Sequence, residues 1–297
     1  MTSAALSSAP ALSQPPATAG IAGSARPAPS AHGSRSTRTA PGFLRSVGVE
    51  LLKMRRLRTP VITALIVGTS VALCSMSLFS ASFTESSHDP HAMPWARLLL
   101  TTGFFNAMIG PIFVSVLASR QTDIEHTGSG WNLAAASGLT PGTLCRAKLV
   151  ALSLLIVPAV TAQSLGIITL ARFRGLSVAL DVGPWATYTT LLICVDLAMC
   201  AYFLWLAAVV ENQMIVMSTG LLSGFIGIFT LLVPPEIVQW TPWGYYALIT
   251  PAAMSATAHS QPDVTYIDVP AGWIAGFLIL TGLLFTVVTH RLDKIER

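Results

Sequence analysis

The stretch ATYTTLLICVDLAMCAYFLWLAAVV-ENQ-MIVMSTGLLSGFIGIFTLLV, from Ala186 to Val233, decides the fold of this chain. It holds two apolar runs of about 20 residues or more, and each is long enough to cross a hydrocarbon core of roughly 30 Å as a helix. Only Glu211, Asn212 and Gln213 join the runs. Because this connection is so short, the two predicted helices must be antiparallel neighbours that cross a membrane in opposite directions.

The composition of the whole chain agrees with a membrane protein. Of its 297 residues, 53% are hydrophobic and 10% are charged, whereas about a quarter of the residues of a soluble protein are charged. We therefore predict an all-α, polytopic membrane protein. Six apolar runs are predicted to be transmembrane helices: residues 60–82, 98–119, 149–171, 186–210, 214–233 and 270–289.

The first 41 residues differ from the rest, because Ala, Ser and Pro dominate and bulky apolar residues are almost absent. Such a segment buries too little apolar surface to offset its ordering entropy, so we predict a disordered tail over residues 1–41. The four cysteines suggest no paired extracellular disulfides. Three of them lie inside apolar runs, and Cys145 is expected to be the accessible thiol.

The distribution of Lys and Arg predicts the orientation, because basic residues are retained on the cytoplasmic side. With a cytoplasmic N-terminus, 14 of the 17 Lys and Arg residues lie inside. Both termini are therefore expected in the cytoplasm of a plasma-membrane protein, together with the segment that connects the second and third spans.

Residues 42–59 are predicted to form an amphipathic helix at the inner membrane surface. Leu44, Val47, Leu51 and Met54 share one helical face, and basic residues lie largely opposite. Two interpretations are open for this helix: a basic anchor that only enforces topology, since Lys and Arg attract anionic headgroups, or a partner-binding element.

The long connection before the last span has the composition of a chain at the lipid headgroup level. Residues 233–269 contain no Lys or Arg, and Trp240, Trp243, Tyr245 and Tyr246 lie close together. Its core is too short to cross the membrane. We predict a short re-entrant or interfacial helix on the outer face, in preference to a solvated loop.

The connection between the second and third spans, TDIEHTGSGWNLAAASGLTPGTLCRAK over residues 122–148, is polar and broken by glycines. Thr122 followed by Glu125 predicts a helix start with a capping box. A short helix is predicted over residues 131–137, Gly138 is a natural C-terminal cap, and Thr140 before Pro141 is a second helix start. A tether would need only a few residues, so we expect a structured functional loop, although a solvated surface loop is the alternative.

This loop resembles the cytoplasmic loop of ABC-type export permeases of the type-2 class, particularly the lantibiotic-immunity and antibiotic-peptide branch. The stretches Glu50–Arg58 and Pro242–Trp243 resemble the same family. The resemblance covers about residues 43–297. The loop residues that carry it are Glu125, Gly130, Trp131, Leu133, Ser137, Gly138, Leu139, Thr140 and Lys148.

The resemblance implies that the loop docks onto a separate ATP-binding subunit. We expect Glu125, Trp131 and Leu133 to form the docking face, because a buried aromatic with a nearby charge is the usual composition of an interface anchor. The resemblance also implies a second permease chain, in a homodimer or a heterodimer, and no nucleic acid partner. The sequence has no G-x-x-x-x-G-K-[ST] motif for phosphate binding, so an ATP-driven reaction needs such a partner. No cofactor motif is recognised.

Inside the spans, the polar residues Asn106, Gln163 and Asp196 lie at similar distances from the predicted outer helix ends and are predicted to form one polar layer. A buried carboxylate is costly in lipid unless it is paired, so Asp196 should face protein or a polar cavity. Interhelical hydrogen bonds and contacts with a substrate are both open as the role of this layer.

No catalytic or metal site is predicted. His88, Asp89 and His91 are suitable ligand types, but with no further ligand cluster they are interpreted as solvated loop residues. Motifs for nucleophilic or zinc catalysis are absent from the sequence, which disfavours an enzyme. We expect an ABC exporter permease for an amphipathic substrate, such as an antibiotic, a peptide or a lipid-like molecule. A secondary transporter and a non-catalytic membrane scaffold are the alternatives.

Overall fold

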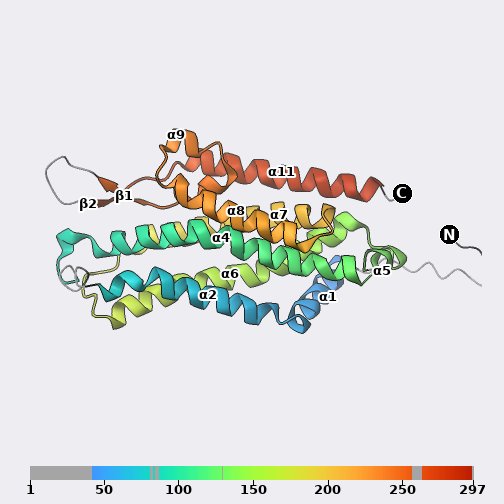
Figure 1. Cartoon of the computed structure of the whole chain (residues 1–297), viewed down its shortest axis with the longest axis horizontal. Coiled ribbons are helices and arrows are strands. Elements are labelled where there is room, and N and C mark those ends of the chain that lie inside the picture. Colours follow the sequence, from blue (N-terminus) through green and yellow to red (C-terminus); the bar gives the residue numbers. More distant parts are fainter. Residues whose placement is uncertain (1–41, 81–82, 84–86, 129, 256–262, 296–297) are drawn as a thin grey trace, which may run out of the picture. The chain divides into compact units, whose positions relative to one another are not determined.

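A computed structural model describes residues 42–80, 83, 87–128, 130–255 and 263–295, and the predicted tail over residues 1–41 lies outside this part of the chain. The described residues are almost entirely helical (Figure 1), which confirms the all-α prediction. The elements in chain order are α1 (Phe43–Arg56), α2 (Thr59–Cys74), η1 (Met76–Phe79), η2 (Pro90–Ala92), α4 (Pro94–Thr127), α5 (Gly130–Ala136), α6 (Pro141–Phe173), α7 (Val182–Val209), α8 (Gln213–Thr230), α9 (Pro235–Val238), η3 (Pro242–Gly244), α10 (Tyr245–Leu248), β1 (Ala252–Ser255), β2 (Asp263–Tyr266) and α11 (Ala271–Ile295).

Among the described residues, five helices are long and apolar enough to cross a membrane, and six if the bent pair α1 and α2 counts as one span. The five are α4, α6, α7, α8 and α11, so the chain is a multi-pass membrane protein. They coincide with the second to sixth predicted spans. The first predicted span corresponds to α2 followed by the 3-10 turn η1.

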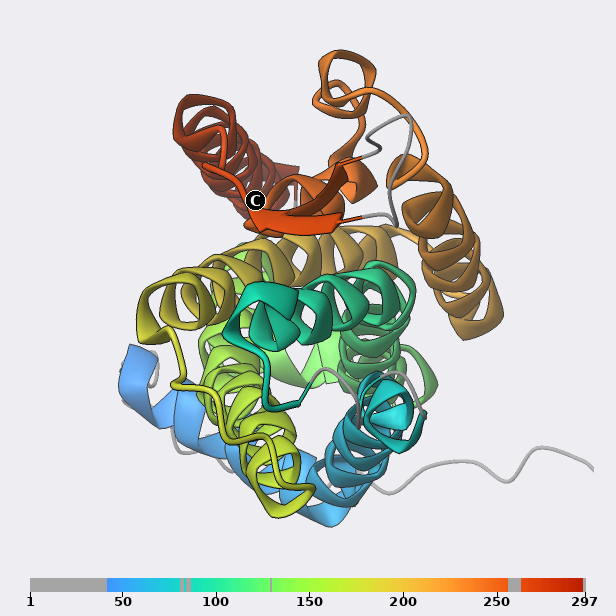
Figure 2. The same cartoon turned by 90° about the vertical axis from the view of Figure 1, so that its left-hand side faces the viewer.

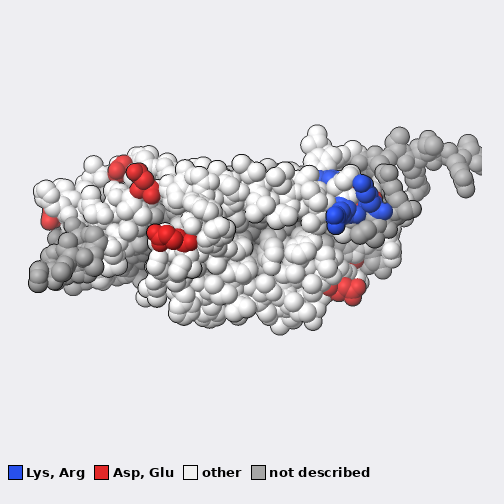
Figure 3. All heavy atoms as spheres, turned by 90° about the horizontal axis from the view of Figure 1, so that it is seen from above, with Lys and Arg blue, Asp and Glu red and all other residues white. Residues whose placement is uncertain are grey.

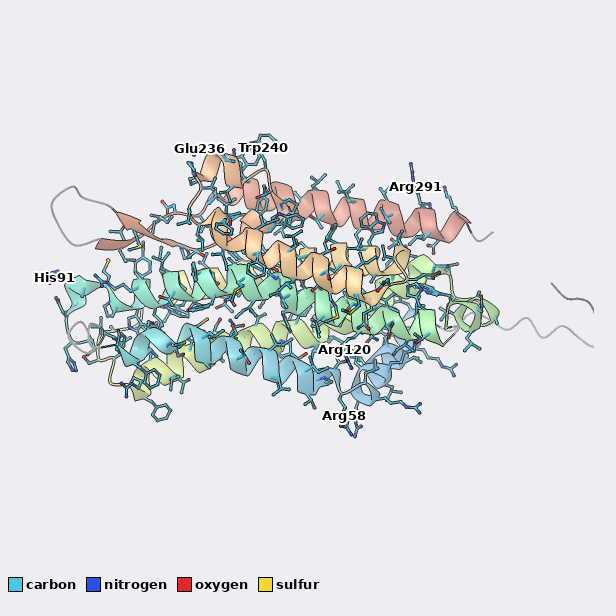
Figure 4. All side chains as sticks on the ribbon, viewed as in Figure 1. Arg58, His91, Arg120, Glu236, Trp240 and Arg291 are labelled. Atoms are coloured by element: carbon cyan, nitrogen blue, oxygen red, sulfur yellow. The ribbon has the colours of Figure 1, made fainter. Side chains whose placement is uncertain are left out.

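The corner between α1 and α2 bends the chain by 67°. Arg58 supplies it with a left-handed backbone conformation, φ 57°, and the following Thr59 and Pro60 open α2, where proline is tolerated because the first helical N–H groups have no partner in the helix. Arg120 of α4 donates a hydrogen bond to the carbonyl oxygen of Leu57 at 3.1 Å. The corner is thus fixed to the bundle, and Figure 4 shows Arg58 and Arg120 near the same end of it.

Glycines bring α4 and α8 into backbone contact. A Cβ atom at Gly224 would overlap the carbonyl oxygen of Met108, and one at Gly227 would overlap that of Ala107. In lipid, helices associate through close packing and polar contacts rather than through the hydrophobic effect, so small residues at an interface favour association. The helices α4 and α8 therefore pack with their backbones in contact, and α7 also packs against α4.

The connection between α8 and α11 differs from the single helix predicted there. It forms the short turns α9, η3 and α10, followed by a hairpin in which β1 and β2 pair antiparallel, with Ala253 opposite Thr265. Figure 2 shows this hairpin at the near end of the bundle, beside α11. The helix stops at Leu248 because Pro251 follows shortly afterwards, and the residue before a proline disfavours helical backbone.

Part of this connection nevertheless enters the bundle, as a re-entrant segment would. Tyr246 of α10 is fully buried, and its ring occupies the space that a side chain at Gly110 of α4 would need. Thr250 fills the corresponding space beside Gly103. The two glycines of α4 therefore make room for the segment.

Charged residues are separated along the bundle. On the face shown in Figure 3, Lys and Arg gather toward one end, where some acidic residues also lie, and a broad band without charged residues separates this end from further acidic residues toward the other end. Figure 4 places Arg58, Arg120 and Arg291 toward one end and His91 and Glu236 toward the other. The segments that the sequence assigns to the cytoplasmic side, which carry Arg58, Arg120 and Arg291, thus lie toward the same end of the bundle.

Candidate functional site

Two lysines and two glutamates form a closed ring of ion pairs where α1, α4 and α6 meet. Lys148 Nζ donates to Glu50 Oε2 at 2.7 Å and to Glu125 Oε1 at 2.8 Å. Lys53 Nζ donates to Glu50 Oε1 at 2.6 Å and to Glu125 Oε1 at 2.7 Å. We call these four residues the charge ring. Its formal charges cancel, which is the condition under which buried charges are tolerated.

Three of the four residues of the charge ring are buried, and Lys53 is partly exposed. The side chains of Glu50, Glu125 and Lys148 are 1–2% exposed, whereas that of Lys53 is 28% exposed. Burial disfavours the charged form of Lys53, but hydrogen bonds to Glu125 and Glu50 outweigh it and raise its pKa. Lys53 therefore stays protonated at neutral pH. Gln121 adds a hydrogen bond from Nε2 to Glu50 Oε2 at 2.8 Å.

The helix α1 supplies the ring from a face that the apolar pattern did not predict. Of the predicted apolar face, Leu44 and Leu51 are 83% and 38% exposed, whereas Val47 and Met54 are buried. Because the medium around α1 includes lipid, apolar side chains gain nothing by turning inward, and the polar Glu50 turns toward protein partners instead. The buried residues of α1 are Ser46, Val47, Glu50 and Met54.

The predicted helix start at Thr122 is wrong. The helix α4 continues through it to Thr127, and the Thr122 hydroxyl donates to the carbonyl oxygen of Ala118 at 2.9 Å. Glu125 does not cap the helix, because Lys148 and Lys53 bind its carboxylate. This carboxylate pairs with the buried Lys148 and the partly exposed Lys53, and the uninterrupted helix has no start at Thr122 that would need a cap.

Other predicted features of the loop are present. The short helix α5 covers residues 130–136, Gly138 has φ 81°, and the Thr140 hydroxyl accepts a hydrogen bond from Thr143 N at 3.4 Å. Gly130 begins α5 directly against Glu125, since a Cβ atom there would overlap Glu125 Oε2. The first residue of α5 thus rests on the charge ring.

The three residues predicted to form a docking face occupy different environments. Leu133 is 68% exposed and Trp131 is half-buried, with its ring 5.9 Å from that of His126. No residue of α5 is buried. Glu125 is 2% exposed, so its carboxylate lies behind this surface and not on it. Cys145 is also only 2% exposed, and the expectation of a freely accessible thiol is wrong because the first turns of α6 pack against the bundle.

The predicted polar layer is divided between two sites. Gln163 Nε2 donates to Asn106 Oδ1 at 2.7 Å, and Asn106 Nδ2 donates to the Tyr188 hydroxyl at 3.0 Å. Asp196 instead accepts a hydrogen bond from the Tyr246 hydroxyl at 2.7 Å. Asp196 lies two helical turns beyond Tyr188 on α7, a separation of about 12 Å.

The reason for this division is that the helices do not begin at one level. Asn106 is well inside α4, yet it contacts Tyr188 close to the start of α7. The start of α4 therefore extends about 9 Å beyond that of α7. Counting residues from each predicted helix end cannot detect such an offset.

The outer loop residues considered as metal ligands make local contacts. His88 Nδ1 lies 2.9 Å from Ser177 Oγ, and Asp89 Oδ1 accepts a hydrogen bond from His91 N at 2.9 Å. Within the described ranges, no group of three or more His, Cys, Asp or Glu residues has the geometry to hold a metal ion.

Sequence reasoning did not identify Glu50, Lys53 and Gln121 as partners of the predicted loop. One signal was present: Glu50 falls between Val47 and Met54 on a single helical face, where a solvated carboxylate is unexpected. The comparisons add no family to this geometry. A scan against protein-family models finds no match, and a search of the curated proteins finds no significant match.

Proposed function

We propose that this protein is the membrane-spanning permease subunit of an ATP-binding-cassette exporter, and that α5 docks onto a separate ATP-binding subunit. The observation that carries the proposal is the position of α5. This helix buries none of its own residues, exposes Leu133, and begins at Gly130 against the buried charge ring. An exposed apolar residue beside a half-buried aromatic is a composition that favours a protein partner.

The charge ring gives this docking element a connection to the membrane helices. Glu125 contacts Gly130 of α5 and also binds Lys53 of α1 and Lys148 of α6. A force that displaces α5 therefore acts on α4, α1 and α6 together. Such a rigid connection is what a transporter needs if ATP hydrolysis in one subunit is to move helices in another.

We assign the end of the bundle that carries α5 to the cytoplasmic side of the plasma membrane. Support comes from the basic residues at this end, because Lys and Arg are retained inside. Arg146 at the start of α6 pairs with Asp293 near the end of α11 at 3.0 Å, so these two elements share one side. A second permease chain, identical or different, is part of the proposal.

The proposed substrate is an amphipathic molecule, such as an antibiotic, a peptide or a lipid-like compound. The sequence resemblance supports this class. The intramembrane residues are compatible with it, since the Asn106 and Asp196 side chains are hydrogen-bonded within the bundle and show no built site for a charged solute.

The test is copurification from native membranes. The wild-type chain should retain an ATP-binding subunit, and Leu133→Glu should lose it while the spans stay folded. Leu44→Glu is the matched control, because Leu44 of α1 is also an exposed leucine on the cytoplasmic half but lies outside α5. Retention of the ATP-binding subunit by Leu133→Glu, or its absence from the wild-type preparation, would contradict the proposal.

A further inference from the structure

A cavity of about 650 Å³ lies between α7, α11 and the turns that precede the hairpin. Its volume is within the range of sites that bind small molecules, roughly 300–1,000 Å³. Aromatic rings from all three regions contribute to its wall. They include Tyr202 and Trp205 of α7, Trp243 of η3, and Trp273 and Phe277 of α11.

The cavity is long in the direction of the helices. On α11, its lining residues run from Trp273 to Val288, which corresponds to about 22 Å of helix. Half of a bilayer hydrocarbon core is roughly 15 Å thick. The cavity therefore offers contact along more than the full depth of one leaflet, which matches an extended chain better than a compact solute.

The lining contains no charged residue among the described residues that form it. Two of its polar groups are already satisfied within the protein. The Thr281 hydroxyl donates to the carbonyl oxygen of Phe277 at 2.9 Å, and the Tyr245 hydroxyl donates to that of Gln239 at 3.0 Å. An ion or a strongly polar molecule would lose its hydration there without compensation, whereas an alkyl chain would not.

The protein itself does not fill this space, and the membrane lies at its edge. In the apolar window of α11 only 6% of the residues are buried, and a Cβ atom at Gly276 would meet no atom within 4 Å. Trp240, whose ring lies 5.4 Å from that of Trp273 at the start of α11, is 74% exposed. An empty apolar space beside lipid forfeits dispersion contacts, so chains from the lipid phase are its natural occupants.

We propose that this cavity is a binding site for one long alkyl chain of an amphiphile dissolved in the membrane. The aromatic walls hold the chain, and its polar end remains near Gln239 and Trp240. This site does not depend on α5 or on an ATP-binding partner, so it stands or falls separately from the proposed export function.

Intrinsic fluorescence provides the test, because four of the seven tryptophans line the cavity: Trp205, Trp240, Trp243 and Trp273. Purified protein in detergent is titrated with 9,10-dibromostearate, whose bromine atoms quench indole fluorescence on contact. We expect saturable quenching with one site per chain. A parallel titration with dibrominated phosphatidylcholine shows whether a diacyl lipid or only a single-chain amphiphile enters.

Two variants fill the cavity and one controls for the substitution. Gly276→Leu and Thr281→Phe should remove the saturable component, and Gly282→Leu should keep it, because Gly282 also has open space around it on α11 but does not line the cavity. Gel filtration verifies that each variant is folded.

The proposal is overturned if quenching rises linearly with probe in the wild-type chain, as expected for partition into detergent. It is equally overturned if both filled variants retain the saturable component. Wild-type tryptophans shielded from both probes would also contradict it and would indicate that a protein segment, such as a second copy, covers the cavity.

Discussion

Removing the charge of Lys148 should strongly destabilise the protein. The Lys148 ammonium makes three hydrogen bonds, to Glu50, Glu125 and the carbonyl oxygen of Gln121, with its side chain 1% exposed. In Lys148→Met, two buried carboxylates share only Lys53, and the ring acquires a net negative charge. Removing one partner of a buried pair costs about 3–5 kcal/mol, and we expect a loss of this size in the free energy of unfolding.

The measurement is denaturant-induced unfolding in mixed micelles, followed by circular dichroism. Lys294→Met is the control, since Lys294 is an exposed lysine near the end of α11 and its loss should change stability by less than about 0.5 kcal/mol. A double-mutant cycle sharpens the test. Adding Glu125→Gln to Lys148→Met restores charge balance, so the double variant should be more stable than the sum of the single effects predicts, by about 1–3 kcal/mol.

Two outcomes would refute this reasoning. A loss below about 1 kcal/mol in Lys148→Met would mean that water or other groups satisfy the carboxylates, and that the ring is not closed. Strict additivity in the cycle would mean that Lys148 and Glu125 do not interact.

Three further predictions concern the bundle. Gly224→Leu should prevent close packing of α4 and α8 and lower thermal stability measured by light scattering, whereas Gly68→Leu, with open space around it, should not; equal effects would contradict the backbone contact. Tyr246→Phe should leave Asp196 without its hydrogen bond and lower the free energy of unfolding by about 1.5–3 kcal/mol. Adding Asp196→Asn in the same chain should recover part of this loss, and no recovery would show that the loss does not come from this pairing. Cys145 should resist maleimide in the folded protein and react after denaturation, so rapid labelling in mild detergent would show that the start of α6 is loose.

The sequence allowed the membrane fold to be predicted because lipid imposes a simple requirement. Every crossing segment must satisfy its backbone groups internally and must be apolar over about 20 residues, and both conditions are readable one segment at a time. The short connection after Val210 and the caps at Thr140 and Gly138 were also predictable, because each involves only residues that are neighbours in the chain. Local chemistry determines them, whatever the helices pack against.

The pairings within the bundle were not predictable in this way. Whether Glu50 meets Lys148 depends on the contact of α1 with α6, and the position of Glu50 between Val47 and Met54 indicates a protein-facing side chain but not which partner it meets. Asn106 and Asp196 lie at similar distances from their predicted helix ends, but the offset between α4 and α7 places them at different levels of the bundle. The strand pairing of Ala253 with Thr265 likewise depends on two segments that are separated in the chain.

The central claim is that α5 is a cytoplasmic docking element, and cysteine labelling at its most exposed apolar position tests it most directly. In Leu133→Cys, made with Cys194→Ser because Cys194 is the one native cysteine of the described chain that is not buried, a membrane-impermeant maleimide is applied to intact cells and to inside-out vesicles. We predict labelling in the vesicles only, and a clear fall in its rate when the proposed ATP-binding subunit is bound. Labelling from outside the cell would contradict the orientation, and labelling in vesicles that the bound subunit leaves unchanged would contradict docking at α5.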